Sequence, residues 1–121
     1  MTERAHRKLP LWKASMDLVE AFYFATQSFP LDEQFGLRAQ IRRAAVSVPA
    51  NIAEGAARKS TAELIQFLYV ANGSLSELDT HLEIAQRLGF VTDDVHALQQ
   101  QLDAVQSQLL TVIASLKRRS R

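Results

Sequence analysis

The chain has 121 residues, of which 47% are apolar and 22% charged, and its formal net charge is +1. This length suits one domain with one modest core. The lack of cysteine excludes disulfides and thiolate metal sites. No apolar run approaches the ~20 residues of a membrane span, and MTERAHRKLP lacks the apolar stretch of a signal peptide. We therefore expect one cytoplasmic domain over residues 1–121, with flexible basic ends at 1–9 and 117–121 and no membrane partner.

Apolar residues recur at steps of three and four along the chain, which is the period of an amphipathic helix. No stretch alternates with the two-residue period of a strand for long enough to form one. The expected helices are residues 11–28, about 33–57, a third from the turn at Ser60 to Gly89, and a fourth opened by Thr92 or Asp93. Long helices with short joints favour an all-α, antiparallel up-down-up-down four-helix bundle.

Side chains and a glycine punctuate these helices. Asp32 is the expected N-cap of the second helix. Ser60 is followed three residues later by Glu63, which is the pattern of a capping box at the start of the third. Gly89 stands where a left-handed residue commonly ends a helix. The four helices thus have stop and start signals of their own.

The segment SVPANIAEG, residues 47–55, places Pro49 in the middle of the second helix. An internal proline removes one backbone hydrogen bond and bends a helix, at a cost of ~3 kcal/mol in an isolated helix. It frees the carbonyl of Ala45, which a hydroxyl or a water can satisfy. One interpretation is a continuous helix kinked at Pro49, which we expect here; the other is a break into two helices.

A polar stripe runs along the same helix at the spacing of a buried seam. If the turn to the third helix centres near residue 60, facing residue numbers sum to about 120 in an antiparallel pair. This register predicts that Arg43 and Glu77 lie close together and are largely buried, and that Ser47 faces Gly73. The expected structural polar seam comprises Gln40, Arg43, Ser47, Asn51, Glu54, Gln66, Glu77 and Thr80.

SVPANIAEG also carries a family resemblance, together with QIRRAA before it and FLYVANGSLSELDTHLEIA after it. With LWKASMDLV and FPLDEQFGLRAQ, the match covers about residues 9–90. The chain resembles the bacterial four-helix bundle protein family, which includes the proteins encoded by intervening sequences in 23S ribosomal RNA genes. It is also similar to the related accessory variability determinant of diversity-generating retroelements.

The resemblance implies a four-helix bundle that assembles as a ring-like homopentamer. The retroelement relative is a basic pentameric barrel that binds nucleic acid and a reverse transcriptase. That relative is more strongly basic than this chain, whose net charge is +1. Many members of the family have no established activity.

Catalytic and metal sites are not expected. A di-metal site of the ferritin type needs Glu-x-x-His pairs, whereas Glu77 and His81 lie four residues apart and have no second pair. A polar network around Glu77 is the favoured interpretation. No glycine-rich phosphate loop or nucleophile elbow occurs, and no histidine follows an arginine at the spacing of helical ribonucleases. We expect no enzymatic activity, no cofactor and no metal.

Two functional hypotheses follow. The first is a homo-oligomeric accessory protein that binds RNA or DNA by charge, and the second is a protein-interaction scaffold with no nucleic-acid role. Each helix has more apolar surface than one small bundle hides, which favours an oligomer with the first helix and the first half of the third at its interface. Tyr23, Phe24, Phe67 and Tyr69 would serve that interface or a partner. The candidate nucleic-acid-binding residues are Arg38, Arg42, Arg58, Lys59, Lys117, Arg118, Arg119 and Arg121.

Overall fold

The structure is a computed structural model that describes residues 4–91 and 95–119. Over these residues it contains four α-helices and no strand, so the predicted all-α four-helix bundle is confirmed. The helices are α1 (Pro10–Ala25), α2 (Leu37–Ala56), α3 (Thr61–Arg87) and α4 (Val95–Arg119), with two short 3-10 helices, η1 (Ala5–Lys8) and η2 (Leu31–Glu33). The predicted caps Thr92 and Asp93 lie outside the described residues, as does Arg121.

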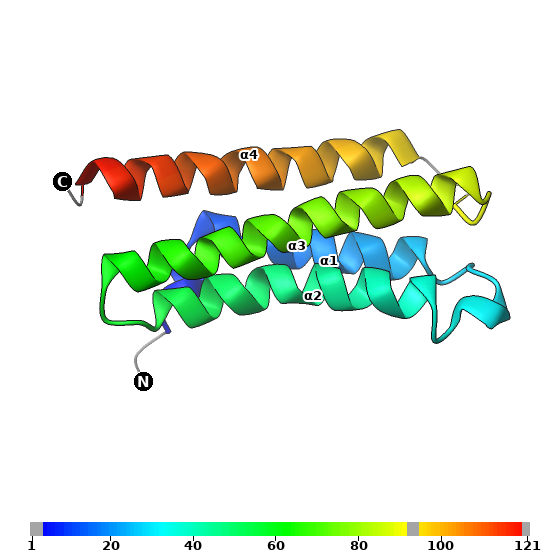
Figure 1. The fold of residues 1–121 in the computed structure, drawn as a ribbon, viewed down its shortest axis with the longest axis horizontal. Helices are drawn as coiled ribbons and strands as arrows, with labels where there is room; N and C mark the ends of the chain where they lie inside the picture. The colour runs from blue at the N-terminus through cyan, green and yellow to red at the C-terminus, as the bar shows by residue number, and fades with distance from the viewer. Residues whose placement is uncertain (1–3, 92–94, 120–121) are drawn as a thin grey trace.

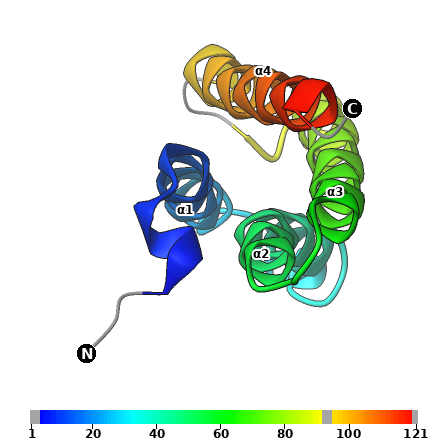
Figure 2. The same ribbon diagram turned by 90° about the vertical axis from the view of Figure 1, so that its left-hand side faces the viewer.

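Successive helices run in opposite directions along the long axis of the molecule, as the colour sequence of Figure 1 shows. Each helix packs against the next one in the chain, and α1 also packs against α4 (Figure 2). The N-terminal segment, the α2–α3 turn and the C-terminal end of α4 therefore lie at one end of the bundle (Figure 1). The α1–α2 and α3–α4 connections lie at the other end.

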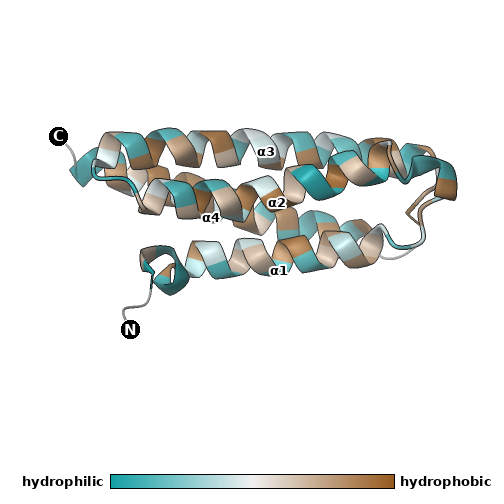
Figure 3. Ribbon diagram, turned by 90° about the horizontal axis from the view of Figure 1, so that it is seen from below, coloured by the Kyte–Doolittle hydropathy of each residue, from teal (hydrophilic) through white to brown (hydrophobic). Residues whose placement is uncertain are grey.

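Apolar side chains from all four helices fill a single core. Hydrophobic and hydrophilic residues alternate along every helix, which gives each helix one face that can be buried (Figure 3). Two stripes of apolar residues run along α1. Leu18 and Phe22 of one stripe are buried, while Met16 and Tyr23 of the other remain 38% and 39% exposed. The largest fully buried side chains are Phe22, Leu18, Ile41, Ile52, Leu68, Leu75, Leu78, Leu82, Leu102 and Leu109.

Both predicted caps of α3 are present. The hydroxyl of Ser60 accepts a hydrogen bond from the backbone N–H of Glu63 at 3.2 Å and donates to its carboxylate at 3.0 Å. At the other end, Gly89 has φ of +74°, and Phe90 N–H bonds the Ala85 carbonyl at 2.9 Å. This is a Schellman ending, which needs the left-handed residue that glycine supplies without steric cost.

The start of α2 differs from the prediction. The helix begins at Leu37 rather than near Glu33, because the chain after Pro30 forms the separate turn η2. The capping side chain also differs from the prediction. Glu33 Oε1 accepts a hydrogen bond from the N–H of Leu37 at 2.9 Å, so Glu33 rather than Asp32 caps α2.

The end of α1 also falls earlier than predicted, at Ala25 rather than Ser28. The next residue, Thr26, is buried and donates its hydroxyl to the Phe22 carbonyl at 2.8 Å. The last carbonyls of α1 are therefore partly satisfied by this side chain rather than by a further helical turn.

Helix α2 is continuous through Pro49, which is buried inside it. The predicted continuity is therefore correct, and the alternative of two separate helices is not found. The bend expected at Pro49 remains a prediction.

The α2–α3 contact has the predicted register but a narrower polar seam. The hydroxyls of Ser47 and Ser74 form a hydrogen bond at 2.9 Å. Their residue numbers sum to 121, close to the value of about 120 predicted for facing residues. Asn51 donates its side-chain amide to the hydroxyl and the carbonyl of Ser47 at 2.9 and 2.8 Å. Ser47 therefore meets Ser74 rather than Gly73.

The predicted burial of Arg43 and Glu77 is wrong, because both side chains are exposed. No ion pair joins them among the described residues; the carboxylate of Glu77 instead lies 3.3 Å from Nε2 of His81, one turn along α3. The outer members of the expected seam are likewise exposed rather than buried: Gln40, Glu54, Gln66 and Thr80. The buried part of the seam is thus confined to Ser47 and Asn51, both half-buried.

Candidate nucleic-acid interface

Cationic side chains gather at the end of the bundle that holds η1, the α2–α3 turn and the end of α4 (Figure 1). We call the described residues 4–13, 54–66 and 108–119 the basic end. It has two carboxylates, Glu54 and Glu63. Its nine cations are Arg4, Arg7, Lys8, Lys13, Arg58, Lys59, Lys117, Arg118 and Arg119. The rest of the described chain reverses this balance, with eight carboxylates against four guanidinium groups. Although the net charge is only +1, positive and negative side chains are therefore strongly separated along the bundle.

Two of the predicted cations at the basic end lie against aromatic rings. The guanidinium of Arg58 lies 4.8 Å from the ring centre of Phe67, and Nζ of Lys117 lies 5.0 Å from that of Tyr69. Arg58 also pairs with Glu54 at 2.6 Å, which offsets its charge. Lys59, Arg118 and Arg119 are exposed. These three are the predicted cations best placed to meet a polyanion.

Arg42 belongs to a different part of the structure. Its Nε donates to the hydroxyl of the buried Thr26 at 2.9 Å, and its Nη2 donates to the Tyr23 carbonyl at 3.1 Å. The guanidinium lies 4.3 Å from the ring centre of Tyr23. It therefore caps the C-terminal end of α1, where a positive charge also favours the helix dipole.

The predicted binding residues consequently do not form one cluster. Arg42 is fourteen residues before the end of α2 at Ala56, or about 21 Å along the helix at 1.5 Å per residue, and Arg58 follows that end. Arg38 is half-buried in the first turn of α2, near Arg42 and far from the basic end. The structure brings together Arg58, Lys59 and the basic residues of α4, and it separates them from Arg38 and Arg42.

The N-terminal cations were missing from the predicted set, although they lie at the basic end. Arg7 lies 5.5 Å from the ring centre of Trp12, and the ring of His6 meets Trp12 edge-on at 4.9 Å. Arg4 and His6 also line a hollow of about 340 Å³ against Glu54 and neighbouring alanines of α2. The sequence could have indicated this, because four antiparallel helices place both termini and the middle turn at the same end of the bundle.

Replacing Arg42 with alanine is expected to lower the free energy of unfolding by about 1–3 kcal/mol, because the buried Thr26 hydroxyl and the end of α1 lose a charged donor. The neighbouring exposed Arg43 is the matched control, and its replacement should change stability by less than about 0.5 kcal/mol. Urea unfolding followed by circular dichroism measures both. Equal losses at the two positions would contradict the capping role of Arg42.

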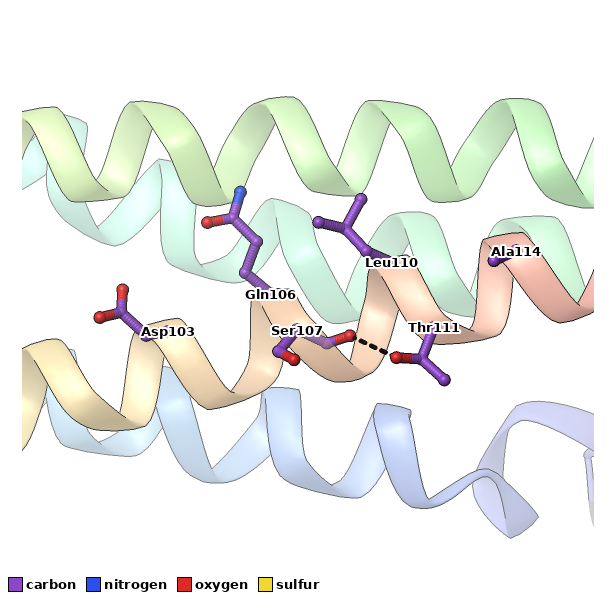
Figure 4. Close-up of a pocket in the computed structure, with 6 residues that line it drawn as sticks. All are labelled: Asp103, Gln106, Ser107, Leu110, Thr111 and Ala114. Atoms are coloured by element: carbon purple, nitrogen blue, oxygen red, sulfur yellow. Dashed lines mark hydrogen bonds between the residues drawn. The ribbon is translucent and has the colours of Figure 1, made fainter.

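The surface also has a shallow depression on the described part of α4. This depression of about 510 Å³ is lined by α4 alone (Figure 4): Asp103, Gln106, Ser107, Leu110, Thr111 and Ala114. Gln106 is occupied by hydrogen bonds to Asn72 and Ser76 of α3, and Thr111 by one to the Ser107 carbonyl. Over residues 4–91 and 95–119 no group of three or more His, Asp or Glu side chains is placed to hold a metal ion.

No helix within the described part of the chain is long and apolar enough to cross a membrane. His81 is the one described side chain with a buried polar atom lacking a hydrogen bond, its Nδ1. Its Nε2 faces Glu77, and this contact lies outside the basic end.

Comparison with known proteins assigns the chain to a family. The family model described as 23S rRNA-intervening sequence protein matches residues 7–111. The chain belongs to this family. The match spans all of α1, α2 and α3 and most of α4, so it covers the bundle and the seam at Pro49.

A solved structure supports the fold. It is the crystal structure of a protein of unknown function from the S23 ribosomal protein family of Bacteroides thetaiotaomicron. It superimposes on this chain with a TM-score of 0.76 and 21% sequence identity, over 85% of this chain and 97% of that one. No curated protein matches the chain significantly.

Proposed function

We propose that this protein is a non-enzymatic, cytoplasmic accessory protein that forms a ring-like homo-oligomer, a pentamer, and binds nucleic acid by charge through its basic end. The observation that carries the proposal is the balance of nine cations against two carboxylates at that end. Lys and Arg side chains that neutralise phosphates release counterions, which drives association without reading the base sequence. Membership of the 23S rRNA-intervening sequence family makes RNA the first polyanion to test.

Oligomerisation would multiply this surface. Each copy contributes one basic end, and several copies on one ring raise the effective concentration of cations for a long polyanion. Candidate interface residues are the side chains of α1 and the first half of α3 that the single bundle leaves exposed. They include Met16, Tyr23, Tyr69 and Val70, at 38%, 39%, 44% and 52%. The subunit number is an expectation from the family resemblance.

The second candidate is a protein-interaction scaffold with no nucleic-acid role. Its support is the net charge of +1 and the surplus of exposed aromatic side chains. Phe67, expected among that surplus, is half-buried under Arg58, so Tyr23, Phe24 and Tyr69 remain.

Size-exclusion chromatography with light scattering tests the proposal directly. The protein is run alone and with a mixed pool of unrelated RNA at about 50 mM salt, where phosphate contacts are strong. We expect an oligomer that shifts to a larger complex with RNA and returns to its own size as salt rises. A monomer at high micromolar concentration would overturn the ring. An oligomer whose size does not change with RNA at low salt would contradict nucleic-acid binding and favour the scaffold function.

A further inference from the structure

The most exposed apolar side chains of the protein lie at the end of the bundle away from the cations. Twelve large hydrophobic side chains among the described residues are exposed. Four of them stand apart at 59–89%, while the other eight lie between 37% and 52%. The four are Phe24, Leu31, Phe35 and Leu88. We call them the apolar end residues.

All four lie in the connections that meet at this end or in the helix ends beside them. Phe24 is in the last turn of α1, Leu31 and Phe35 are in the α1–α2 connection, and Leu88 is the C-cap of α3. The two connections touch, since the rings of Phe29 and Phe90 lie 5.6 Å apart. Phe24 also lines a hollow of about 260 Å³ with Val91, Ala97 and Leu98, residues from the other side of this contact. Both connections therefore contribute exposed apolar side chains to this end of the bundle.

The exposed area is large for a small domain. Taking about 200 Å² for a whole aromatic side chain, Phe24 and Phe35 alone expose on the order of 300 Å². The largest contiguous apolar patch on a typical monomer is about 300–600 Å², so these two side chains together expose an area at the lower end of that range. Phe35 and Leu31, at 89% and 80% exposure, contribute almost nothing to the core, so their apolar character is not explained by folding.

The charges beside these side chains are mostly negative. Glu20 lies one helical turn before Phe24, and Asp32 directly follows Leu31. Over residues 20–42 and 79–99 the described charges are five carboxylates and three guanidinium groups. Arg42 is in the cap of α1, and Arg87 pairs with Glu83 at 2.8 Å. The carboxylate of Glu83 raises the pKa of Arg87 through this hydrogen bond and its charge. Glu33 accepts the N–H of Leu37, and Asp79 accepts a hydrogen bond from Gln99. The carboxylates next to the apolar end residues are therefore Glu20 and Asp32, which are both exposed.

We propose that this end is a docking surface for a protein partner that presents a cationic amphipathic helix. Apolar side chains of the partner would cover Leu31 and Phe35, and its Lys or Arg residues would meet the flanking carboxylates. An anionic membrane is disfavoured by the same carboxylates. A second copy that docked its basic end here would make a head-to-tail contact, which gives open filaments unless its rotation closes a ring. The inference does not depend on nucleic-acid binding, whose residues lie at the opposite end.

Fluorescence anisotropy with synthetic peptides tests the docking surface. The probe is a labelled amphipathic helix of Leu and Lys, and its control is the same helix with Glu in place of Lys. The protein variant carries Leu31→Ser and Phe35→Ser, and the matched control carries Val46→Ser and Leu110→Ser, which alter apolar side chains exposed at 43% and 45% outside this end. We expect the Leu–Lys helix to bind wild type and the control, and the Leu31/Phe35 variant to lose about tenfold in affinity.

Several outcomes would overturn the docking surface. They are equal binding of the Leu–Glu helix, unchanged affinity in the Leu31/Phe35 variant, and tighter binding to anionic vesicles than to the peptide. A smaller sedimentation coefficient of the variant alone would assign the surface to a second copy instead. Circular dichroism of each variant checks that the fold is intact, which the exposure of both replaced side chains favours. RNA binding by the Leu31/Phe35 variant should equal that of wild type, which separates failure here from failure of the basic end.

Discussion

Replacing Gly55 with leucine is expected to lower the free energy of unfolding by about 3 kcal/mol. A Cβ at this position would lie 2.9 Å from Cβ of Phe67, 3.1 Å from Cδ1 of Leu64 and 3.3 Å from the Leu64 carbonyl oxygen. Two of these three atoms are held by the α3 backbone, so neither can swing away. The new side chain must therefore push α2 and α3 apart where they pack most closely.

Gly73 is the matched control, because it is also a glycine inside a long helix. A Cβ added there would meet nothing within 4 Å. Its replacement by leucine should raise stability by about 0.5–1 kcal/mol, since leucine is a far better helix former than glycine. Thermal and urea unfolding of both variants measure the two signs. A loss at Gly73 as large as at Gly55 would show that something packs against α3 there.

Removing residues 117–121 is expected to weaken nucleic-acid binding by roughly 100-fold or more at about 50 mM salt, because four cations are lost and each phosphate contact is strongly salt-dependent. The slope of log affinity against log salt should fall by up to about 3.6 for duplex DNA, at about 0.9 per phosphate neutralised. The loss should be alike for unrelated RNA and DNA sequences, since backbone contacts carry no sequence information. Filter binding across a salt series measures it.

The fold should survive this truncation, because the last buried residue of α4 is Ile113 and the half-buried Leu116 is retained. A control variant with Arg38→Ala and Arg87→Ala removes charge away from the basic end and should leave affinity within about twofold of wild type. If the truncated protein binds as tightly as the full chain, the C-terminal cations have no part in binding. If the control loses as much as the truncation, only overall charge matters.

The helices could be predicted from the sequence because apolar residues keep a three- and four-residue period throughout. Ser60 and Gly89 were also readable, since each acts through its own backbone or the next turn. The start of α2 was not, because two carboxylates in LDEQFG were candidate caps, and only the η2 turn decides that Glu33 reaches Leu37 N–H.

The burial of Arg43 was misjudged for a geometric reason. The polar stripe on α2 drifts over about 80° of the helix circumference at 3.6 residues per turn. Ser47 and Asn51 sit on its side nearer α3, whereas Arg43 and Glu54 sit farther round toward solvent. The register of the pair was correct, but the rotation of α2 about its own axis is set by the whole core and not by the stripe.

Some, but not all, of the cations of the candidate site could be predicted from the sequence. Clusters along the sequence pointed to Arg58, Lys59 and the C-terminal cations, and these do share the basic end. Arg42 was wrongly grouped with these cations, because the sequence does not show that its guanidinium is hydrogen-bonded to Thr26 and Tyr23. The apolar end residues were mostly missed, since periodicity assigns exposed residues in connections to no face at all.

The separation of charge along the bundle has a consequence for how this protein meets other molecules. In the field of a polyanion the two ends experience opposite forces, so the molecule is turned as well as attracted. At 0.1 M salt the screening length is about 10 Å, which is far shorter than the ~37 Å of α4 at 1.5 Å per residue. The torque therefore acts only in the last moments of an encounter, when one end is already nearer. On the proposed binding to nucleic acid, a collision with the basic end forward would be favoured, and one with the other end forward would be repelled.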